Sequence, residues 1–138
     1  YNDNIFHKLA LSNTRGEKEI YYSESSENIG TSSLIESKEI KDDQIEKINS
    51  ETLDSLYDFK NKKIIMKIDV EEYENFVIKG SLDILKNNKI LIYIETDDLN
   101  LLDQLMKIGY KRYFFKHREN IVEFTNESTG KDVILKNF

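Results

Sequence analysis

Two short apolar segments with an amphipathic stretch between them constrain the fold of this chain more than any other feature. Residues 64–70 read IIMKIDV and residues 89–95 read KILIYIE, and both are strand-length runs rich in branched side chains. From Tyr73 to Ile84 the apolar positions recur at steps of three and four, the period of a helix. This order predicts a right-handed βαβ unit with two parallel strands.

The residues around the central helix carry signals for its two ends. The segment 64–70 lacks the alternation of a half-exposed strand, so we expect a strand buried on both faces. Asp69 is expected to cap the helix, and acids crowd the first turn, where the helix dipole favours them: Glu71, Glu72 and Glu74. The pair Asn87 and Asn88 is expected to end the helix.

The remaining segments predict further strands and one more helix. Residues 1–22 predict a strand, a turn at Gly16 and a strand, and residues 23–33 predict a loop. A short strand near Ile45 and a helical turn near Leu53 are expected to follow.

After the second apolar strand, Asp97 or Asp98 is expected to cap a helix that ends at Gly109. The segments KRYFF and NIVEF then predict an antiparallel hairpin at the sheet edge, and residues 131–138 predict a last short strand.

Composition narrows the class of protein. The length of 138 residues suits a single domain, and a net charge of -6 argues against a nucleic-acid surface built on clustered Lys and Arg. The apolar runs are too short for a membrane span, and the absence of Cys suits a cytoplasmic protein without thiolate chemistry. Because the chain begins at Tyr1 rather than Met, we expect a piece of a longer product.

Acidic residues follow both apolar strands. Asp69 and Glu71 follow the first strand, and Glu95, Asp97 and Asp98 follow the second. Because ligands of parallel α/β sheets bind at the carboxyl ends of the strands, these acids predict a general base or a Mg²⁺ site. Helix capping alone is the favoured explanation for four acids in this region: Glu72, Glu74, Asp97 and Asp98.

Asp69 and Glu95 are the stronger candidates, because each ends an apolar strand where a charge needs a partner. Lys67 could supply that partner, although an exposed amine at the sheet edge is an equal alternative. His7 and His117 lie in different segments and away from the strand ends, which argues against a His triad or a zinc site. The chain contains neither GxGxxG nor a P-loop motif.

The segment KIDVEEYENFVIKGSLDIL, residues 67–85, and the strand ILIYIE that follows resemble the FkbM-like family of S-adenosylmethionine-dependent methyltransferases. The family's KIDVEG(Y/F)E segment corresponds to residues 67–74, its VLKG-like run to residues 77–80, and its Gly-Tyr helix end to Gly109 and Tyr110. Upstream, LALSNTRGEKEIYY, ENIGTSSL and TLDSL resemble family segments in the same order.

The resemblance implies a Rossmann-like methyltransferase sheet, mostly parallel with a C-terminal antiparallel hairpin and incomplete at its N-terminus. Of the strand order 3-2-1-4-5-7-6, this chain would supply the third strand and the fourth through the last. The family's glycine-containing cofactor segment would precede Tyr1, and the fourth strand would then present an unpaired edge. On this interpretation the whole chain is the C-terminal part of one methyltransferase domain.

The resemblance also implies roles for individual residues. Ala10 and Leu11 would lie near the adenine of S-adenosylmethionine, and Asp69 near its methionine end or the acceptor hydroxyl. Glu71 and Glu95 would lie around the acceptor, whose pocket would be lined by Asn28, Ser32 and Ser33. Glu72 stands where the family has Gly, which adds bulk and charge at a position suited to close backbone approach.

We therefore expect an O-methyltransferase acting on a hydroxyl of a small molecule or sugar, without a nucleic-acid or membrane partner. A divalent metal is neither required nor excluded by the residues. The alternatives are a catalytically silent α/β domain that binds a partner or forms a homo-oligomer through its sheet edge, and a metal-dependent phosphotransfer site on the acidic rim.

Overall fold

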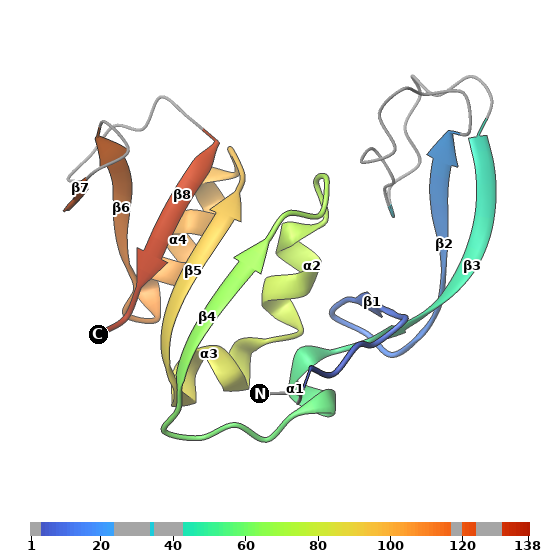
Figure 1. Cartoon of the computed structure of the whole chain (residues 1–138), viewed down its shortest axis with the longest axis horizontal. Helices are drawn as coiled ribbons and strands as arrows, with labels where there is room; N and C mark the ends of the chain where they lie inside the picture. Colours follow the sequence, from blue (N-terminus) through green and yellow to red (C-terminus); the bar gives the residue numbers. More distant parts are fainter. Residues whose placement is uncertain (1–3, 24–33, 35–42, 117–119, 124–130) are drawn as a thin grey trace. The chain divides into compact units, whose positions relative to one another are not determined.

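The computed structural model describes residues 4–23, 34, 43–116, 120–123 and 131–138. The chain divides into two compact units of mixed α/β structure. The first unit comprises residues 1–57 and 71–81, and the second comprises residues 58–70 and 82–138. Figure 1 labels the elements of both, and each unit is treated separately below.

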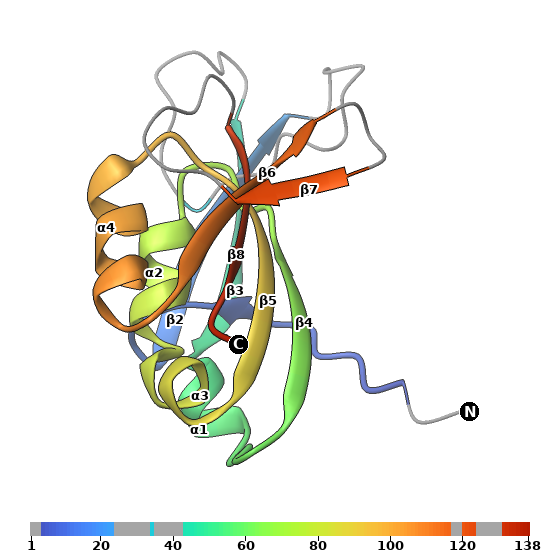
Figure 2. The same cartoon turned by 90° about the vertical axis from the view of Figure 1, so that its left-hand side faces the viewer.

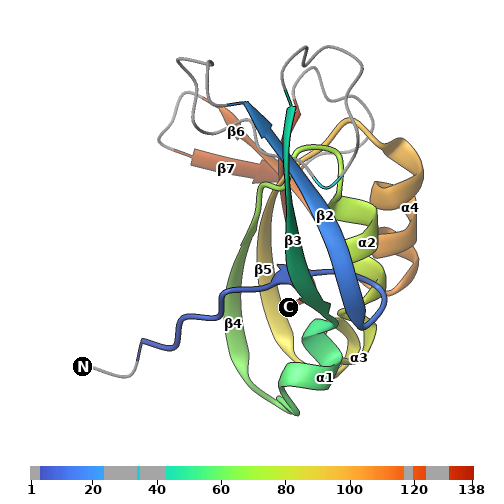
Figure 3. The ribbon, with the colours of Figure 1, turned by 90° about the vertical axis from the view of Figure 1, so that its right-hand side faces the viewer.

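The first unit contains a three-stranded sheet of order β1-β3-β2 (Figure 3). Strand β1 (Ala10–Leu11) pairs in parallel with β3 (Asp43–Glu51), and β2 (Gly16–Ser23) pairs antiparallel with β3 over eight residues. The two predicted strands are confirmed, although β1 is only two residues long, and Gly16, which was expected in the turn between them, is the first residue of β2. The strand predicted near Ile45 is longer than expected.

Two short helices complete the first unit. Helix α1 (Leu53–Leu56) is the helical turn predicted near Leu53, and the Thr52 side chain caps it by accepting a hydrogen bond from the Ser55 amide. Helix α2 (Glu74–Lys79) ends at Gly80, where the backbone passes so close to Ser12 that an added Cβ would lie 1.9 Å from the Ser12 carbonyl oxygen. Only glycine fits at this contact between β1 and α2.

The second unit contains a five-stranded sheet of order β4-β5-β8-β6-β7. Strands β4 (Lys63–Ile68) and β5 (Lys89–Glu95) pair in parallel, which confirms the parallel pair predicted from the two apolar segments. Strand β8 (Asp132–Lys136) lies between β5 and β6 (Lys111–Lys116) and is antiparallel to both. Strands β4, β5 and β6 therefore run in one direction. Strand β7 (Asn120–Glu123) forms the predicted hairpin with β6.

Helices α3 (Leu82–Asn87) and α4 (Leu99–Lys107) cover one face of this sheet (Figure 2). The covered face carries the isoleucines of β5 at positions 90, 92 and 94, all fully buried together with Leu101, Leu102 and Leu105 of α4. Asp98 caps α4 by accepting hydrogen bonds from the amides of Asn100 and Leu101, and Gly109 follows at φ 102°, as predicted. Burial of these apolar side chains is the main stabilising contribution in the unit.

Three expectations about the central segment are wrong. Strand β4 is not buried on both faces: Ile65 is 83% exposed while Ile68 is 3% exposed. The helix does not begin at Asp69 but at Glu74, after a turn in which Glu71 and Glu72 have positive φ. It is also not continuous, because α2 and α3 are separated at Gly80 and Ser81, and the Ser81 hydroxyl donates to the Val77 carbonyl at 2.7 Å.

The expected mostly parallel sheet is not found either. Among the described strands, only the β1–β3 and β4–β5 pairs are parallel, whereas β2–β3, β5–β8, β6–β7 and β6–β8 are antiparallel. The reason is that β8, expected only as a short last strand, inserts into the sheet against the direction of its neighbours. No described strand pairs with the outer edge of β4, as the resemblance implied.

Candidate functional site

The end of strand β4 places a lysine and a carboxylate together. The parallel register sets Lys67 opposite Tyr93, and Asp69 follows two residues later on the same face. The Lys67 ammonium donates a hydrogen bond to Asp69 Oδ2 at 2.7 Å. Asp69 is therefore held by the strand that precedes it rather than by the helix it was expected to cap.

Two more carboxylates lie on the neighbouring strands. Glu95 at the end of β5 is directly opposite Asp132 at the start of β8. The Tyr93 hydroxyl donates a hydrogen bond to Asp132 Oδ1 at 2.6 Å, linking β5 to β8. We call the five residues that meet at this edge the rim cluster: Lys67, Asp69, Tyr93, Glu95 and Asp132.

Electrostatic effects link Lys67 and Tyr93 to the carboxylates of the rim cluster. The hydrogen bond and charge of Asp69 raise the pKa of Lys67 above its ordinary 10.5, and the charges of Glu95 and Asp132 raise it further. The hydrogen bond to Asp132 raises the pKa of Tyr93, with contributions from burial and from the charges of Glu95 and Asp69. Carboxylates from more than one segment therefore stabilise the protonated forms of Lys67 and Tyr93.

Stability does not explain this arrangement well. The side chains of Lys67 and Asp69 are 65% and 39% exposed, and ion pairs this exposed contribute little to folding. Carboxylates directly opposite each other, such as Glu95 and Asp132, repel. The rim cluster has three carboxylates and one ammonium, an excess of negative charge that suits a cationic ligand or proton acceptance from a hydroxyl.

Within the residues that the structure describes, no group of three or more His, Asp or Glu side chains is arranged to hold a metal ion. The positive charge among the rim carboxylates is supplied by Lys67.

The other predicted site residues lie elsewhere. Ala10 and Leu11 form the half-buried strand β1 of the first unit, paired with Ser50 and Glu51. Glu71 also belongs to the first unit, where it is exposed at φ 44°. The predicted acceptor residues lie outside the described part of the chain: Asn28, Ser32 and Ser33.

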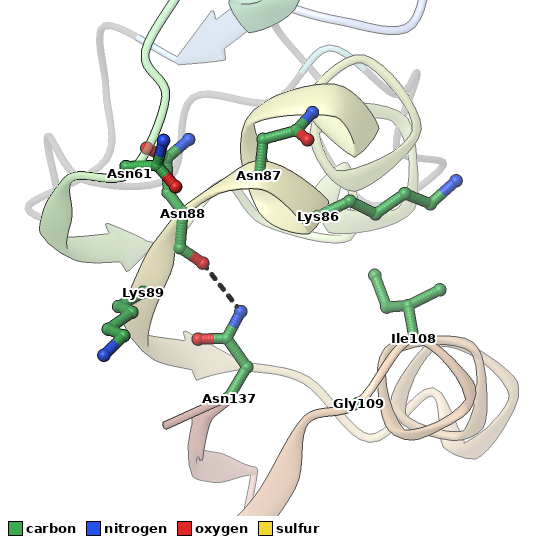
Figure 4. A pocket seen from close by; sticks show the side chains of 8 residues that line it. All are labelled: Asn61, Lys86, Asn87, Asn88, Lys89, Ile108, Gly109 and Asn137. Carbon is green, nitrogen blue, oxygen red and sulfur yellow. Dashed lines mark hydrogen bonds between the residues drawn. The ribbon is translucent and has the colours of Figure 1, made fainter.

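The structure also contains hollows whose described lining includes none of the predicted site residues. One of about 400 Å³ in the first unit borders the β2–β3 ribbon and Tyr73. Another, of about 570 Å³ in the second unit, lies where β5 begins and α3 ends (Figure 4). The rim cluster is at the opposite end of that sheet, because Asp69 and Glu95 follow the strands that begin beside the hollow.

Sequence reasoning missed two members of the rim cluster. Residues two apart in a strand point to the same face, so Tyr93 lies on the same face as Glu95. This alternation could have predicted that Tyr93 belongs to the site. Asp132 had no such signal, since nothing in residues 131–138 says that this strand inserts beside β5. Lys67 was considered as a partner for an acid, and that alternative is confirmed.

None of the helices in the described ranges is both long and apolar enough to cross a membrane. The family model described as "Methyltransferase FkbM domain" matches residues 1–126, most of the chain. No curated protein and no solved structure matches it.

Proposed function

The chain belongs to the methyltransferase FkbM domain family, and from this premise we propose that it is the C-terminal part of an S-adenosylmethionine-dependent O-methyltransferase. The acceptor would be a hydroxyl of a small molecule or sugar. The observation that carries the proposal is the rim cluster, in which Asp69 and Glu95 flank one ammonium at the ends of parallel strands.

The order of the strands supports a Rossmann-like sheet. In the order implied by the resemblance, the last strand lies between the fifth and the sixth. Strand β8 has this position, between β5 and β6, and runs against both. Open sheets of this kind bind ligands beyond the carboxyl ends of their parallel strands, which is where the rim cluster lies.

The rim cluster fits S-adenosylmethionine by charge, because an anionic edge attracts a sulfonium cation. When bound, this cofactor supplies an electrophilic methyl group. We assign its methionine end to Asp69 and its adenine to Ala10 and Leu11.

The chain's own residues would orient the acceptor and take up its proton. Asp69, held by Lys67 at 2.7 Å, would accept the proton of the hydroxyl as the oxygen–carbon bond forms and the sulfur–methyl bond breaks, which releases S-adenosylhomocysteine; Glu71 is the alternative base. Glu95 and Asp132, the latter fixed by Tyr93, would accept hydrogen bonds from other hydroxyls of a sugar. The acceptor pocket is assigned to Asn28, Ser32 and Ser33.

Asp69→Asn tests the role of the proposed base. Removing a positioned general base lowers turnover by about 100-fold or more, so the variant should lose methyl transfer at saturating cofactor. The assay follows transfer of a radiolabelled methyl group to a panel of sugars and small hydroxyl compounds by the active protein.

Asp58→Asn is the matched control. Asp58 also pairs with a lysine, Lys60, at 2.9 Å, but it belongs to the segment before β4 and not to the rim cluster. Its replacement should leave turnover unchanged. Unchanged turnover in Asp69→Asn with cofactor binding intact would refute Asp69 as the base.

A further inference from the structure

One face of the sheet in the second unit is not covered by α3 and α4, which both lie on the other face (Figure 2). On the uncovered face, Ile65 of β4 is 83% exposed, and the neighbouring Leu91 of β5 is half-buried. Next to them, Tyr93 and Tyr113 are half-buried on either side of Ile134. Parallel strands are usually buried on both faces, so an apolar surface beside the β4–β5 pair is unusual. We call this surface the open face.

The open face carries opposite charges at its two ends. Lysines lie at the end where β4 and β5 begin: Lys63, Lys89, Lys111 and Lys136. Carboxylates of the rim cluster lie at the other end: Asp69, Glu95 and Asp132. Lys63 and Lys89, which are directly opposite each other, form no ion pair with any residue in the described ranges. Like charges that face each other destabilise a sheet, so each end has an energetic cost that an oppositely charged partner would offset.

A second copy of the chain matches this charge distribution in one of two symmetric arrangements. Two identical faces pack against each other about a twofold axis that lies between them. An axis along the strands would place lysines on lysines and carboxylates on carboxylates. An axis across the strands reverses the strands of the second copy, so the lysines of each copy meet the carboxylates of the other. Charge complementarity therefore selects the reversed arrangement.

The register of the sheet identifies the side chains that would meet. On β5, the residues of the open face follow in the order Lys89, Leu91, Tyr93 and Glu95. Reversal about the centre of this row places Leu91 on Tyr93 of the second copy, and Lys89 on Glu95 of the second copy. Asp132 is directly opposite Glu95, so each Lys89 ammonium would lie near two carboxylates that otherwise repel.

We propose that two copies of the chain associate through their open faces, with their strands reversed, to form a symmetric dimer. One sheet face is a small interface, so we expect a weak dimer with a dissociation constant of about 10–100 µM. The dimer does not depend on the methyltransferase proposal. Where both hold, the second copy and the acceptor would compete for Glu95 and Asp132.

Sedimentation equilibrium of the 138-residue chain measures the association. At about 0.15 M salt we expect a monomer–dimer equilibrium between about 5 and 500 µM protein, and a weaker dimer at about 1 M salt, which screens the charge pairs. Ile65→Ser removes the most exposed apolar side chain of the open face and should weaken the dimer by about tenfold. A chain that stays monomeric up to about 500 µM would overturn the proposal.

Charge reversal tests which residues meet. Lys89→Glu sets two carboxylates against each other in the dimer, and Glu95→Lys sets two ammonium groups against each other, so each variant alone should dimerise at least about tenfold more weakly. An equimolar mixture of the two variants should dimerise as tightly as the unmodified chain, because each contact again joins opposite charges. Both positions are exposed, so neither change disturbs the core.

Lys86→Glu is the matched control, because it makes the same change of charge on α3, at the other face of the sheet. It should dimerise like the unmodified chain. The proposal is overturned if Lys86→Glu weakens the dimer as much as Lys89→Glu, or if Ile65→Ser leaves it unchanged. It is also overturned if the mixture of Lys89→Glu and Glu95→Lys stays monomeric while circular dichroism shows both variants folded, which would assign the association to another surface.

Discussion

Glu72 has a backbone conformation that glycine adopts more easily. Its φ is 71°, and Glu71 before it has φ 44°, so two consecutive glutamates are in the left-handed region. A side chain there costs roughly 1 kcal/mol, because Cβ approaches the following carbonyl oxygen. Glu72 stands at the position of the Gly in the family's KIDVEG segment. The positive φ at this position explains why the family has Gly.

Replacing Glu72 with Gly should therefore stabilise the chain. We expect Glu72→Gly to raise the free energy of unfolding by about 0.5–1 kcal/mol, less than the relieved strain because Gly gains freedom in the unfolded state. Urea unfolding measures the change. Lys79→Gly, at the exposed last residue of α2, should lower stability by about 0.5 kcal/mol, and a loss of stability in both variants would contradict this explanation.

Gly80 and Gly109 are required for different reasons. Gly80 has φ -83°, which any residue adopts, but an added Cβ would meet the Ser12 carbonyl oxygen at 1.9 Å. Gly109 has φ 102° and open space around it. Gly80→Ala should cost about 3 kcal/mol through overpacking, and Gly109→Ala about 1 kcal/mol through conformation. Thermal unfolding in which Gly109→Ala is the more damaging would reject the steric explanation.

At the scale of elements, prediction from sequence succeeded where one local signal dominated. Strand β5 and helix α4 have the predicted bounds within a few residues, because β5 is an uninterrupted apolar run and α4 has an Asp98 cap and a terminal Gly109. The prediction that β4 is buried on both faces was wrong, although IIMKI has apolar residues on both faces. Ile65 is exposed because it lies on the face of the sheet opposite α3 and α4, which only the tertiary structure decides.

The candidate site was predictable to a similar degree. Asp69 and Glu95 were identified because charges at the ends of apolar strands are conspicuous, and the structure brings both close to Lys67. Asp132 could not be identified, because its place in the rim cluster depends on the insertion of β8 between β5 and β6. Long-range strand order of this kind leaves little trace in local sequence.

Tyr110 connects two helices and makes stability depend on pH. Its hydroxyl donates to the Leu85 carbonyl at the end of α3, its amide donates to Leu105 in α4, and the side chain is 3% exposed. Burial raises the pKa of Tyr110 far above its ordinary 10.0. The folded state therefore keeps a proton that the unfolded state loses above about pH 10, so this contribution is present below that pH and is lost as pH rises.

Tyr110→Phe should remove that dependence. Near neutral pH the variant should be less stable by about 1 kcal/mol, through loss of the hydrogen bond to Leu85. Between about pH 10 and about pH 11.5, the stability of the unmodified chain should fall more steeply, by up to about 1.4 kcal/mol per pH unit. Urea unfolding at several pH values gives both slopes, and equal slopes would show that Tyr110 does not carry the effect.

At the scale of the whole molecule, charge in the second unit is segregated along its sheet. Carboxylates gather where β4 and β5 end, and lysines gather where these strands begin. Our proposal is that the acidic edge binds a sulfonium cofactor and an acceptor hydroxyl.

Calorimetric titration of the 138-residue chain with S-adenosylhomocysteine tests the central claim, cofactor binding, most directly. This product of methyl transfer binds without turnover and requires no knowledge of the acceptor. We predict saturable binding with one site per chain. Absence of binding up to about 1 mM ligand, by a chain shown to be folded by circular dichroism, would contradict the claim that these residues form a cofactor site.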